Sequence, residues 1–211
     1  MKTPRKTIGN ILLCIGLLLL LAGGIWYAHN LHESNRAYEL GVEEVAKVKE
    51  FVAKRREELS TSQPEITVEG GTSVHAPVKQ LPVFVIDDYP YCGYLYIPDI
   101  ELEMAVVDEA TEQNMKYSLC RYAGDPFQQN MVIAGHNYRS VFRKLRDLEA
   151  GDDIYFTDMD GEVFHYTVLE SVVIPGKGVE EMLEGEWDLT LFTCTYGGAD
   201  RYTIRCVEVD D

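Results

Sequence analysis

The sequence has few basic residues, no paired-cysteine motif and no second membrane segment towards its C-terminal end. It carries 19 Lys and Arg against 35 Asp and Glu, a formal net charge of −16. Three of the 19 basic residues lie within the first six positions, so 16 basic residues face 35 acidic ones over the rest of the chain. Nucleic acids and anionic lipid surfaces both bind basic faces. The charge balance therefore argues against either as a partner of the main domain.

The first thirty residues, MKTPRKTIGNILLCIGLLLLLAGGIWYAHN, are organised like a membrane anchor. Basic residues precede an uncharged run over residues 8–28, which as a helix is roughly 31 Å long and crosses a bilayer. Trp26 and Tyr27 lie at its far end, where interfacial aromatic residues are typical. The positive-inside rule predicts a cytoplasmic tail over residues 1–7 and an extracytoplasmic chain after the anchor. We therefore expect a single-pass protein of the cell membrane.

A cleaved signal peptide and a lipoprotein anchor fit this segment less well. A cleaved signal peptide requires a small-residue A-x-A site after a short apolar core, and no clear site of that kind is present. A lipoprotein requires a small residue before the modified cysteine, whereas Leu13 precedes Cys14.

The cysteine pattern argues against zinc and redox chemistry. None of the cysteines outside the anchor forms a C-x-x-C pair. An extracytoplasmic location permits disulfides, so Cys92 and Cys120 either pair with each other or are simple buried thiols. The chain has five cysteines: Cys14, Cys92, Cys120, Cys194 and Cys206.

A helical stem and a linker are expected between the anchor and the main domain. Apolar residues at roughly helical spacing over 31–59 predict an amphipathic helix that packs lightly on the domain. Gly41 and Lys49 interrupt the apolar stripe and disfavour a coiled-coil dimer. Residues 60–82 are rich in Ser, Thr, Gly and Pro and predict a linker or an extended wrap. The predicted divisions are a tail (1–7), an anchor (8–28), a stem and linker (29–80) and a compact domain (81–211).

The compact domain has the pattern of a mainly β fold. Short apolar or alternating runs separated by turn residues predict a closed β-barrel or a sandwich. Asp160-Gly161 predicts a hairpin turn, and residues 111–118 and 138–148 predict short helices. The expected strands are 94–98, 102–107, 130–135, 152–158, 162–174, 188–194 and 201–209.

The stretch LTLFTCTYGGADRYTIRCVEV raises the main functional question. Strand alternation places Leu189 and Leu191 on the core face, so Cys194 lies on the other face at the end of the first run. Arg201 falls on the face of Cys194 at the start of the second run, whereas Cys206 falls in the core. A cysteine exposed at the end of a strand is a candidate nucleophile, because its thiolate can attack a substrate.

A cysteine nucleophile also needs a group that moves protons, and histidine is the usual one near neutral pH. His29 and His32 lie next to the membrane, His75 lies in the linker, and His165 lies in the middle of a strand. His136 is different, because it follows a strand and a glycine in NMVIAGHNYRS. It is therefore the candidate acid and base.

These motifs resemble the sortases, the membrane-anchored cysteine transpeptidases of Gram-positive bacteria. The family's T-L-x-T-C signature is similar to residues 190–194, its strand-borne histidine to VIAGHN, and its arginine to DRYTIR. The segment GYLYIPDIELEMAV resembles the opening strands of the family. The resemblance covers roughly residues 93–209 together with the anchor. It implies an eight-stranded sortase-type β-barrel with short helices.

The resemblance also implies a mechanism and a set of site residues. Cys194 is expected to attack the Thr–Gly-type bond of an LPXTG-like sorting signal and to form a thioacyl enzyme. His136 is expected to transfer protons and Arg201 to stabilise the oxyanion, with Arg205, one strand repeat deeper, as the competing arginine. The acceptor is expected to be an amine of lipid II, a peptidoglycan cross-bridge or a pilin lysine. The residues expected to bind substrate are Thr190, Phe192, Thr193 and Asn137.

The class of sortase remains open at this point. The short connection PGKGVEEMLEGEW is unlike the long helical insert of the iron-acquisition class, and it should flank the substrate groove. Asp125-Pro126-Phe127 resembles the lid motif of the pilin-polymerising class, but it precedes the His136 strand and is interpreted as a turn. The absence of a second membrane segment also argues against that class. A housekeeping-like or class D-like enzyme is therefore favoured.

No cofactor is expected, although some relatives bind calcium. The acidic residues here lack the spacing of a calcium loop, and a solvated acidic face is the simpler interpretation. The residues concerned are Glu101, Glu103, Asp108, Glu109 and Glu112.

A non-catalytic binding module and an L,D-transpeptidase fit the sequence less well. A membrane-tethered β-barrel that binds peptides without turnover would not need Cys194, His136 and Arg201 together. A transpeptidase of the L,D type carries its cysteine in a His-Gly-Cys context, which LFTCTYGG does not provide.

Overall fold

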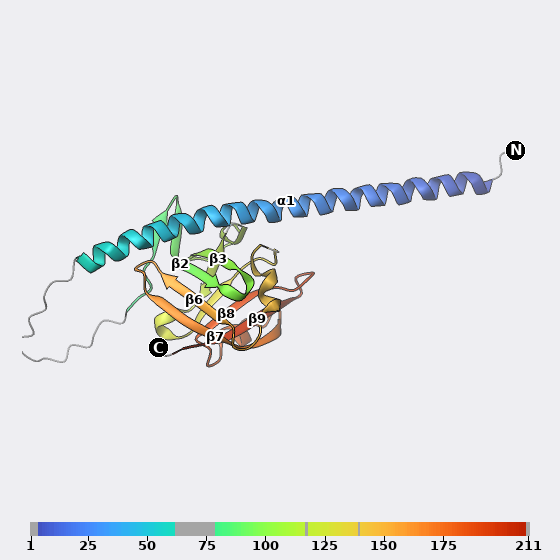
Figure 1. Cartoon of the computed structure of the whole chain (residues 1–211). Coiled ribbons are helices and arrows are strands. Elements are labelled where there is room, and N and C mark those ends of the chain that lie inside the picture. Colours follow the sequence, from blue (N-terminus) through green and yellow to red (C-terminus); the bar gives the residue numbers. More distant parts are fainter. Residues whose placement is uncertain (1–3, 62–78, 117, 139, 210–211) are drawn as a thin grey trace, which may run out of the picture. The chain divides into compact units, whose positions relative to one another are not determined.

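The computed structural model describes residues 4–61, 79–116, 118–138 and 140–209. Figure 1 shows its secondary structure. The helices are α1 (Pro4–Thr61) and α2 (Val179–Leu183), and the 3-10 turns are η1 (Pro98–Ile100), η2 (Asn114–Lys116), η3 (Pro126–Gln128) and η4 (Phe142–Asp147). The strands are β1 (Phe84–Ile86), β2 (Tyr89–Ile97), β3 (Leu102–Val107), β4 (Leu119–Ala123), β5 (Met131–Ala134), β6 (Asp153–Asp158), β7 (Val163–Pro175), β8 (Leu189–Cys194) and β9 (Asp200–Glu208).

Eight of the strands form a closed barrel. The order around it is β2-β3-β4-β5-β8-β9-β7-β6, and pairing of β2 with β6 closes the ring. β1 is a short ninth strand that pairs with the first residues of β2, outside the ring. Most neighbours are antiparallel, whereas β3–β4 and β5–β8 are parallel. The expected closed, mainly β barrel is confirmed, and the sandwich alternative is wrong because the described strands form one closed sheet.

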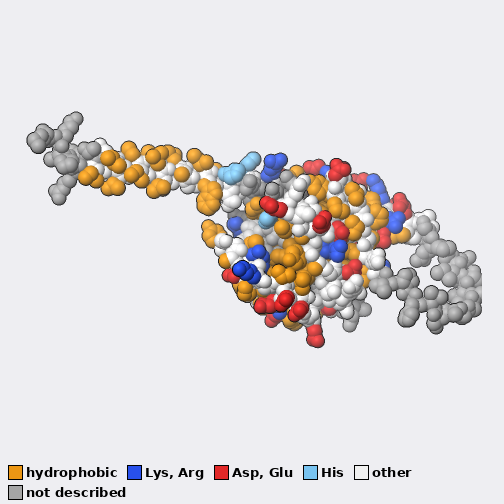
Figure 2. Space-filling model, turned by 180° about the vertical axis from the view of Figure 1, so that it is seen from behind, with side chains coloured by type: hydrophobic (Ala, Val, Ile, Leu, Met, Phe, Trp, Pro, Cys, Tyr) orange, Lys and Arg blue, Asp and Glu red, His pale blue; other side chains and the backbone are white. Residues whose placement is uncertain are grey.

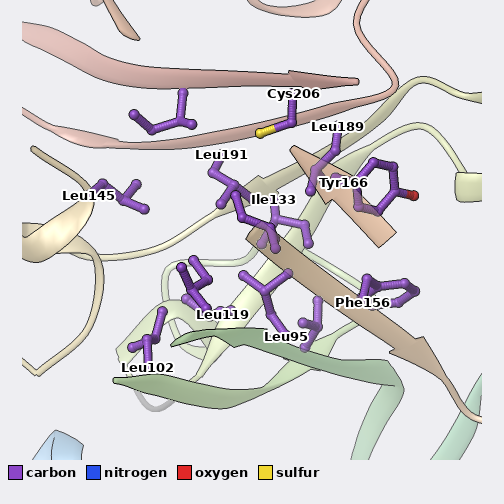
Figure 3. Close-up of a cluster of buried hydrophobic side chains, with 14 of the residues drawn as sticks. Leu95, Leu102, Leu119, Ile133, Leu145, Phe156, Tyr166, Leu189, Leu191 and Cys206 are labelled. Carbon is purple, nitrogen blue, oxygen red and sulfur yellow. The ribbon is translucent and has the colours of Figure 1, made fainter. Parts of the chain in front are cut away.

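The barrel interior is filled by alternate residues of every strand, as the period of two requires. Figure 3 shows the inward side chains of the strands meeting around Ile133. Leu189, Leu191 and Cys206 are fully buried there, on the face that strand alternation predicted. Phe142 and Leu145 of η4 are also fully buried in this cluster, so η4 contributes to the same core.

Two expected helices are only 3-10 turns. Within 111–118 the described regular structure is η2, and within 138–148 it is η4. The 3-10 hydrogen-bond pattern is typical of runs this short, since a helix of so few residues is marginal by itself. The expected hairpin at Asp160-Gly161 is confirmed, since β6 ends at Asp158 and β7 begins at Val163.

The helix α1 is continuous from Pro4 to Thr61, so it covers both the expected anchor and the expected stem. Its segment Ile8–His32 is long and apolar enough to cross a membrane, on length and composition alone. Apolar side chains cover this part of α1 in Figure 2. The structure forms two compact units, residues 1–36 and residues 37–211.

Within the second unit, the end of α1 packs on the outside of the barrel. Val45, Val48 and Val52 are buried against Tyr91, Met159 and their neighbours. Polar contacts flank this interface: Lys49 Nζ lies 2.6 Å from a Glu103 carboxylate oxygen, Arg55 Nε lies 2.9 Å from Asp160 Oδ1, and the Tyr91 hydroxyl donates to Glu44. The predicted linker over residues 60–82 lies largely outside the described residues.

Candidate active site

The parallel strands β5 and β8 place His136 and Cys194 in equivalent positions. Ala134 pairs with Phe192, and the Gly135 amide donates to the Phe192 carbonyl at 3.1 Å. His136 and Cys194 each follow that pair by two residues. Because neighbouring parallel strands end at the same edge, both side chains lie at one end of the barrel and on one face.

Gly135 is required by the packing of this end of the barrel. A Cβ atom on Gly135 would lie 2.7 Å from both Leu119 and the Phe142 ring. After the glycine, the Phe142 amide donates to the His136 carbonyl at 3.2 Å, and the Tyr138 ring centroid lies 5.2 Å from that of His136. The Ala-Gly-His sequence therefore ends β5 against Phe142 of η4. The imidazole of His136 is half-buried there.

Arg201 joins the same end of the barrel from the third strand. It is the direct antiparallel partner of Cys194 in the β8–β9 ladder. Its Nη1 donates to the carbonyls of Gly198 and Asp200, at 3.0 and 3.1 Å. The turn between the strands is closed by the Thr195 amide, which donates to the Asp200 carbonyl at 2.9 Å. The guanidinium is therefore held at the tip of the β8–β9 turn, next to the thiol-bearing residue.

Arg205, the competing arginine, is engaged elsewhere. Its Nη1 lies 3.2 Å from Glu170 Oε1, and its Nη2 donates to the Glu181 carbonyl at 3.1 Å. Its guanidinium also lies 4.8 Å from the centre of the Trp187 ring. These contacts hold it on β7 and on the segment between β7 and β8, which favours Arg201 for a role near Cys194.

The four residues expected to bind substrate have different surroundings. Phe192 lies on the Cys194 face and packs with Val132, Ala134 and Met182. Thr190 lies on that face too but is only 3% exposed. Little of the Thr190 side chain is therefore accessible to a substrate, and its expected role stays a prediction.

Thr193 and Asn137 carry buried polar atoms. Thr193 alternates to the face opposite Cys194 and is only 2% exposed. Its Oγ1 and the Oδ1 of Asn137 have no hydrogen-bond partner among the described residues. Such atoms are costly to bury, and they are common near functional sites. Thr193 therefore lies on the face opposite Cys194, and its expected role in orienting the peptide stays a prediction.

The thiols of the barrel differ in exposure. Cys92, Cys120 and Cys206 are free and fully buried. Burial raises the pKa of the Cys120 thiol to about 12 and also raises the pKa values of Cys92 and Cys206. Cys194 is free and partly exposed. Of the two possibilities for Cys92 and Cys120, the structure therefore shows simple buried thiols.

Two residues that pack on Phe192 were not identified from the sequence. Tyr122 on β4 meets Phe192 edge-on, with ring centroids 5.3 Å apart. Met182 of α2 is 7% exposed and packs on the same ring. Met182 gives no sequence signal, because a single apolar residue in a polar loop has no period. β4 was not among the expected strands, and its register shifts between Arg121 and Ala123, so strand alternation did not indicate Tyr122.

The acidic residues considered for calcium do not gather into a ligand set. Among the described residues, no group of three or more His, Cys, Asp or Glu side chains is arranged to hold a metal ion. Two of the five candidates are paired with cations instead. Asp108 Oδ1 lies 2.6 Å from Arg121 Nη2, and Glu103 is bound by Lys49.

A family model described as the sortase domain matches residues 95–209. The chain belongs to the sortase family. It is 23% identical to Sortase A of Bacillus anthracis over 190 residues, with 85% of each chain covered. Sortases are transpeptidases that attach proteins to the cell wall or to pilins, and this activity comes with family membership.

Solved sortase structures share the fold. A Clostridium perfringens Sortase D5 transpeptidase is 18% identical, with 82% of this chain and 99% of that chain covered and a TM-score of 0.56. A Clostridium perfringens sortase C with a C-terminal cell wall sorting motif is 21% identical, with 80% and 91% covered and a TM-score of 0.50. This sortase is similar to members named A, C and D5, so these likenesses do not select a class.

Proposed function

We propose that this sortase cleaves an LPXTG-like sorting signal through a thioacyl intermediate on Cys194. The supporting observation is the register of three adjacent strands: the residues that follow β5 and end β8 are level with each other, and Arg201 of β9 is paired with Cys194. A nucleophile, a proton-transfer group and a cation at one strand edge are the parts that acyl transfer requires.

The proposed first step forms the thioester. The Cys194 thiolate attacks the carbonyl carbon of the scissile peptide bond, and Arg201 hydrogen-bonds to the oxyanion as it develops. The carbon–nitrogen bond then breaks, and His136 donates its proton to the leaving amine.

The proposed second step transfers the acyl group from Cys194 to an amine. An incoming amine gives a proton to neutral His136 and attacks the thioester carbonyl. The carbon–sulfur bond breaks and the Cys194 thiolate is released. The product is a new amide, and no oxidant, metal or cofactor enters the balance. The acceptor is proposed to be a cell-wall or pilin amine, such as that of lipid II, a peptidoglycan cross-bridge or a pilin lysine.

The proposed location follows from the anchor. Residues 1–7 form a cytoplasmic tail, residues 8–28 span the membrane, residues 29–80 form the stem and linker, and residues 81–211 form the extracytoplasmic catalytic domain. The basic residues before the span favour this orientation.

The experiment is a transpeptidation assay followed by mass spectrometry. The full chain in detergent micelles is mixed with a small library of LPXTX peptides and an amine acceptor, with Cys194→Ala as the control. A thioacyl adduct on Cys194 together with an amine-exchanged product is the expected result. Peptide binding without an adduct or product, from folded protein with a titratable Cys194 thiol, would instead favour a non-catalytic binding module.

A further inference from the structure

The connection between β7 and β8 forms one wall beside the candidate catalytic residues. It covers residues 176–188 and contains α2. Met182 of α2 packs on Val132, Ala134 and Phe192, which lie two to four residues before His136 and Cys194 on their own strands. The connection therefore covers the barrel face on which the thiol and the imidazole are displayed.

This wall has little intrinsic stability. A five-residue helix is far below the length at which a helix is stable on its own in water. Met182 is the one residue between 176 and 188 that is buried, and most of the others in that range are exposed. One buried methionine, with three flexible bonds, does not define a single position for such a segment. Contacts to the barrel must therefore hold it.

Arg205 provides those contacts. It lies on β9 opposite both Glu170 of β7 and Thr190 of β8. Its guanidinium forms an ion pair with Glu170 at 3.2 Å and donates to the backbone carbonyl of Glu181 in α2 at 3.1 Å. It also lies over the Trp187 ring, 4.8 Å from its centre. One side chain thus joins two barrel strands, α2 and the end of the connection.

The backbone near Trp187 is fitted to this arrangement. Gly185 has φ +138°, and a Cβ atom there would lie 2.3 Å from Trp187 Nε1. The indole therefore packs directly on the Gly185 backbone, and only glycine adopts this conformation without strain. With the ring fixed on one side by Gly185, the guanidinium of Arg205 covers it from another. A planar, always charged group makes such a stack and two directed hydrogen bonds together, and lysine does not.

We infer that Arg205 is a positioning residue that fixes α2 as the wall of the substrate groove. This role rests on the proposed function and adds the residue that controls the shape of the groove for the peptide. Arg205 acts through Glu181 and Trp187 and does not take part in the chemistry at Cys194. Its loss should therefore weaken peptide binding and leave the thiol and the acyl-transfer steps intact.

The test compares Arg205→Ala, Arg205→Lys and the wild type as full chains in detergent micelles. For Arg205→Ala we expect KM for the sorting peptide to rise about tenfold, the effect of losing one charge-assisted anchor, with kcat within about twofold. Arg205→Lys keeps the charge beside Glu170 but not the stack, so its KM should lie between the two. Amide hydrogen exchange over 179–184 should be faster in Arg205→Ala and partly restored in Arg205→Lys.

The control is Arg55→Ala, which removes an arginine–carboxylate pair at Asp160 on the stem side of the barrel. It should leave KM and the exchange of α2 unchanged. The rate at which iodoacetamide alkylates Cys194 should be the same within about twofold in all of these proteins.

Two results would overturn the inference. A large fall in kcat at unchanged KM in Arg205→Ala would mean that Arg205 stabilises the transition state. An unchanged KM with unchanged exchange over 179–184 would mean that Arg205 does not hold the wall. If the wild type forms no product, the proposed function fails independently, and fluorescence anisotropy of a labelled LPXTG peptide on Cys194→Ala, with and without Arg205→Ala, still decides the role of Arg205.

Discussion

Cys194 lies directly opposite Arg201 in the antiparallel ladder between β8 and β9. The two residues therefore share one face of the barrel. The turn between them brings Arg201 back to the end of the barrel at which Cys194 lies. The guanidinium is already hydrogen-bonded to two carbonyls of the connecting turn, so the turn itself holds its position before any substrate arrives. Such preorganisation is what stabilisation of a developing oxyanion requires.

Replacing Arg201 by lysine should lower kcat. Lysine keeps the positive charge but loses the planar set of donors that bridges the turn and an oxyanion. We expect a fall of about 10²–10³-fold in kcat/KM, the range found when one oxyanion donor is removed. The measurement is steady-state transpeptidation, with Arg146→Lys, an exposed arginine on η4, as the control. Activity within about threefold of the wild type would contradict the role assigned to Arg201.

Replacing His136 by alanine should lower kcat by about 10²–10⁴-fold, the usual contribution of a positioned acid and base. His165→Ala is the matched control, because His165 lies on β7 and its Nε2 lies 2.8 Å from Asp153 Oδ1. That variant should retain activity. Single-turnover formation of the thioacyl adduct separates the two residues, and equal losses in both variants would contradict the assignment.

Cys194 should be the reactive thiol of the native barrel. A charged maleimide should label it quickly, whereas the three buried thiols should react only after unfolding, because burial both excludes the reagent and raises their pKa values. Cys14→Ser removes the exposed thiol of α1 from the background. Mass spectrometry of tryptic peptides gives the labelled positions. Rapid labelling of Cys120 in the folded protein would show that the barrel opens far more readily than its packing indicates.

Val48→Ala should destabilise the docking of α1 on the barrel. Val48 is fully buried there, and removing its buried methyl groups costs about 2 kcal/mol. Val42→Ala is the control on the same helix, because Val42 is 48% exposed and its truncation should cost less than about 0.5 kcal/mol. Urea unfolding of the full chain in detergent micelles measures both. Equal costs in the two variants would contradict this packing.

Asp158 should make the barrel less stable as the pH rises. Burial raises its pKa to about 6, although the Asp160 and Glu162 amides donate to its Oδ1 and Lys79 lies nearby. Because the folded pKa exceeds the unfolded value, the folded state binds the proton more tightly. The stabilisation is therefore complete below about pH 4 and is lost as the pH rises towards about 6 and above.

Asp158→Asn keeps an oxygen acceptor for both amides and removes the ionisation. We expect the variant to be more stable than the wild type by about 1–2 kcal/mol at about pH 7.5 and equally stable at about pH 4. Thermal unfolding over this pH range measures the difference. A variant that is less stable at every pH would mean that the carboxylate charge itself is needed at the β6–β7 hairpin.

Much of the fold was predictable because its signals are local. Strand alternation in LTLFTC and RYTIRC decides which residues point inward, since the period of two holds on any pleated strand. It correctly assigned Leu191 and Cys206 to the core and Cys194 to the opposite face. The anchor-like segment follows from length and hydropathy, which need no tertiary contacts.

Other features were decided only by packing between distant segments. Residues 138–148 were expected to form a helix, whereas the structure has the 3-10 turn η4 within that range. Its residues Phe142 and Leu145 pack in the core cluster of the barrel. Thr190 was expected to bind substrate from its motif, and only the packing of the barrel decided that it is 3% exposed. The packing of Met182 on Phe192 and the hydrogen bond from Arg205 to Glu181 became recognisable only once β7, β8 and β9 were neighbours.

The sequence by itself predicted a membrane anchor and determined the strand faces and the residue types at the candidate site, because periodicity and charge act over a few neighbouring residues. The tertiary structure alone decided that β5 pairs with β8 in parallel and β8 with β9 antiparallel, since strand pairing depends on contacts between residues far apart in the chain. That pairing brings His136, Cys194 and Arg201 to one edge. It also gives Arg205 the contacts that keep it away from the thiol.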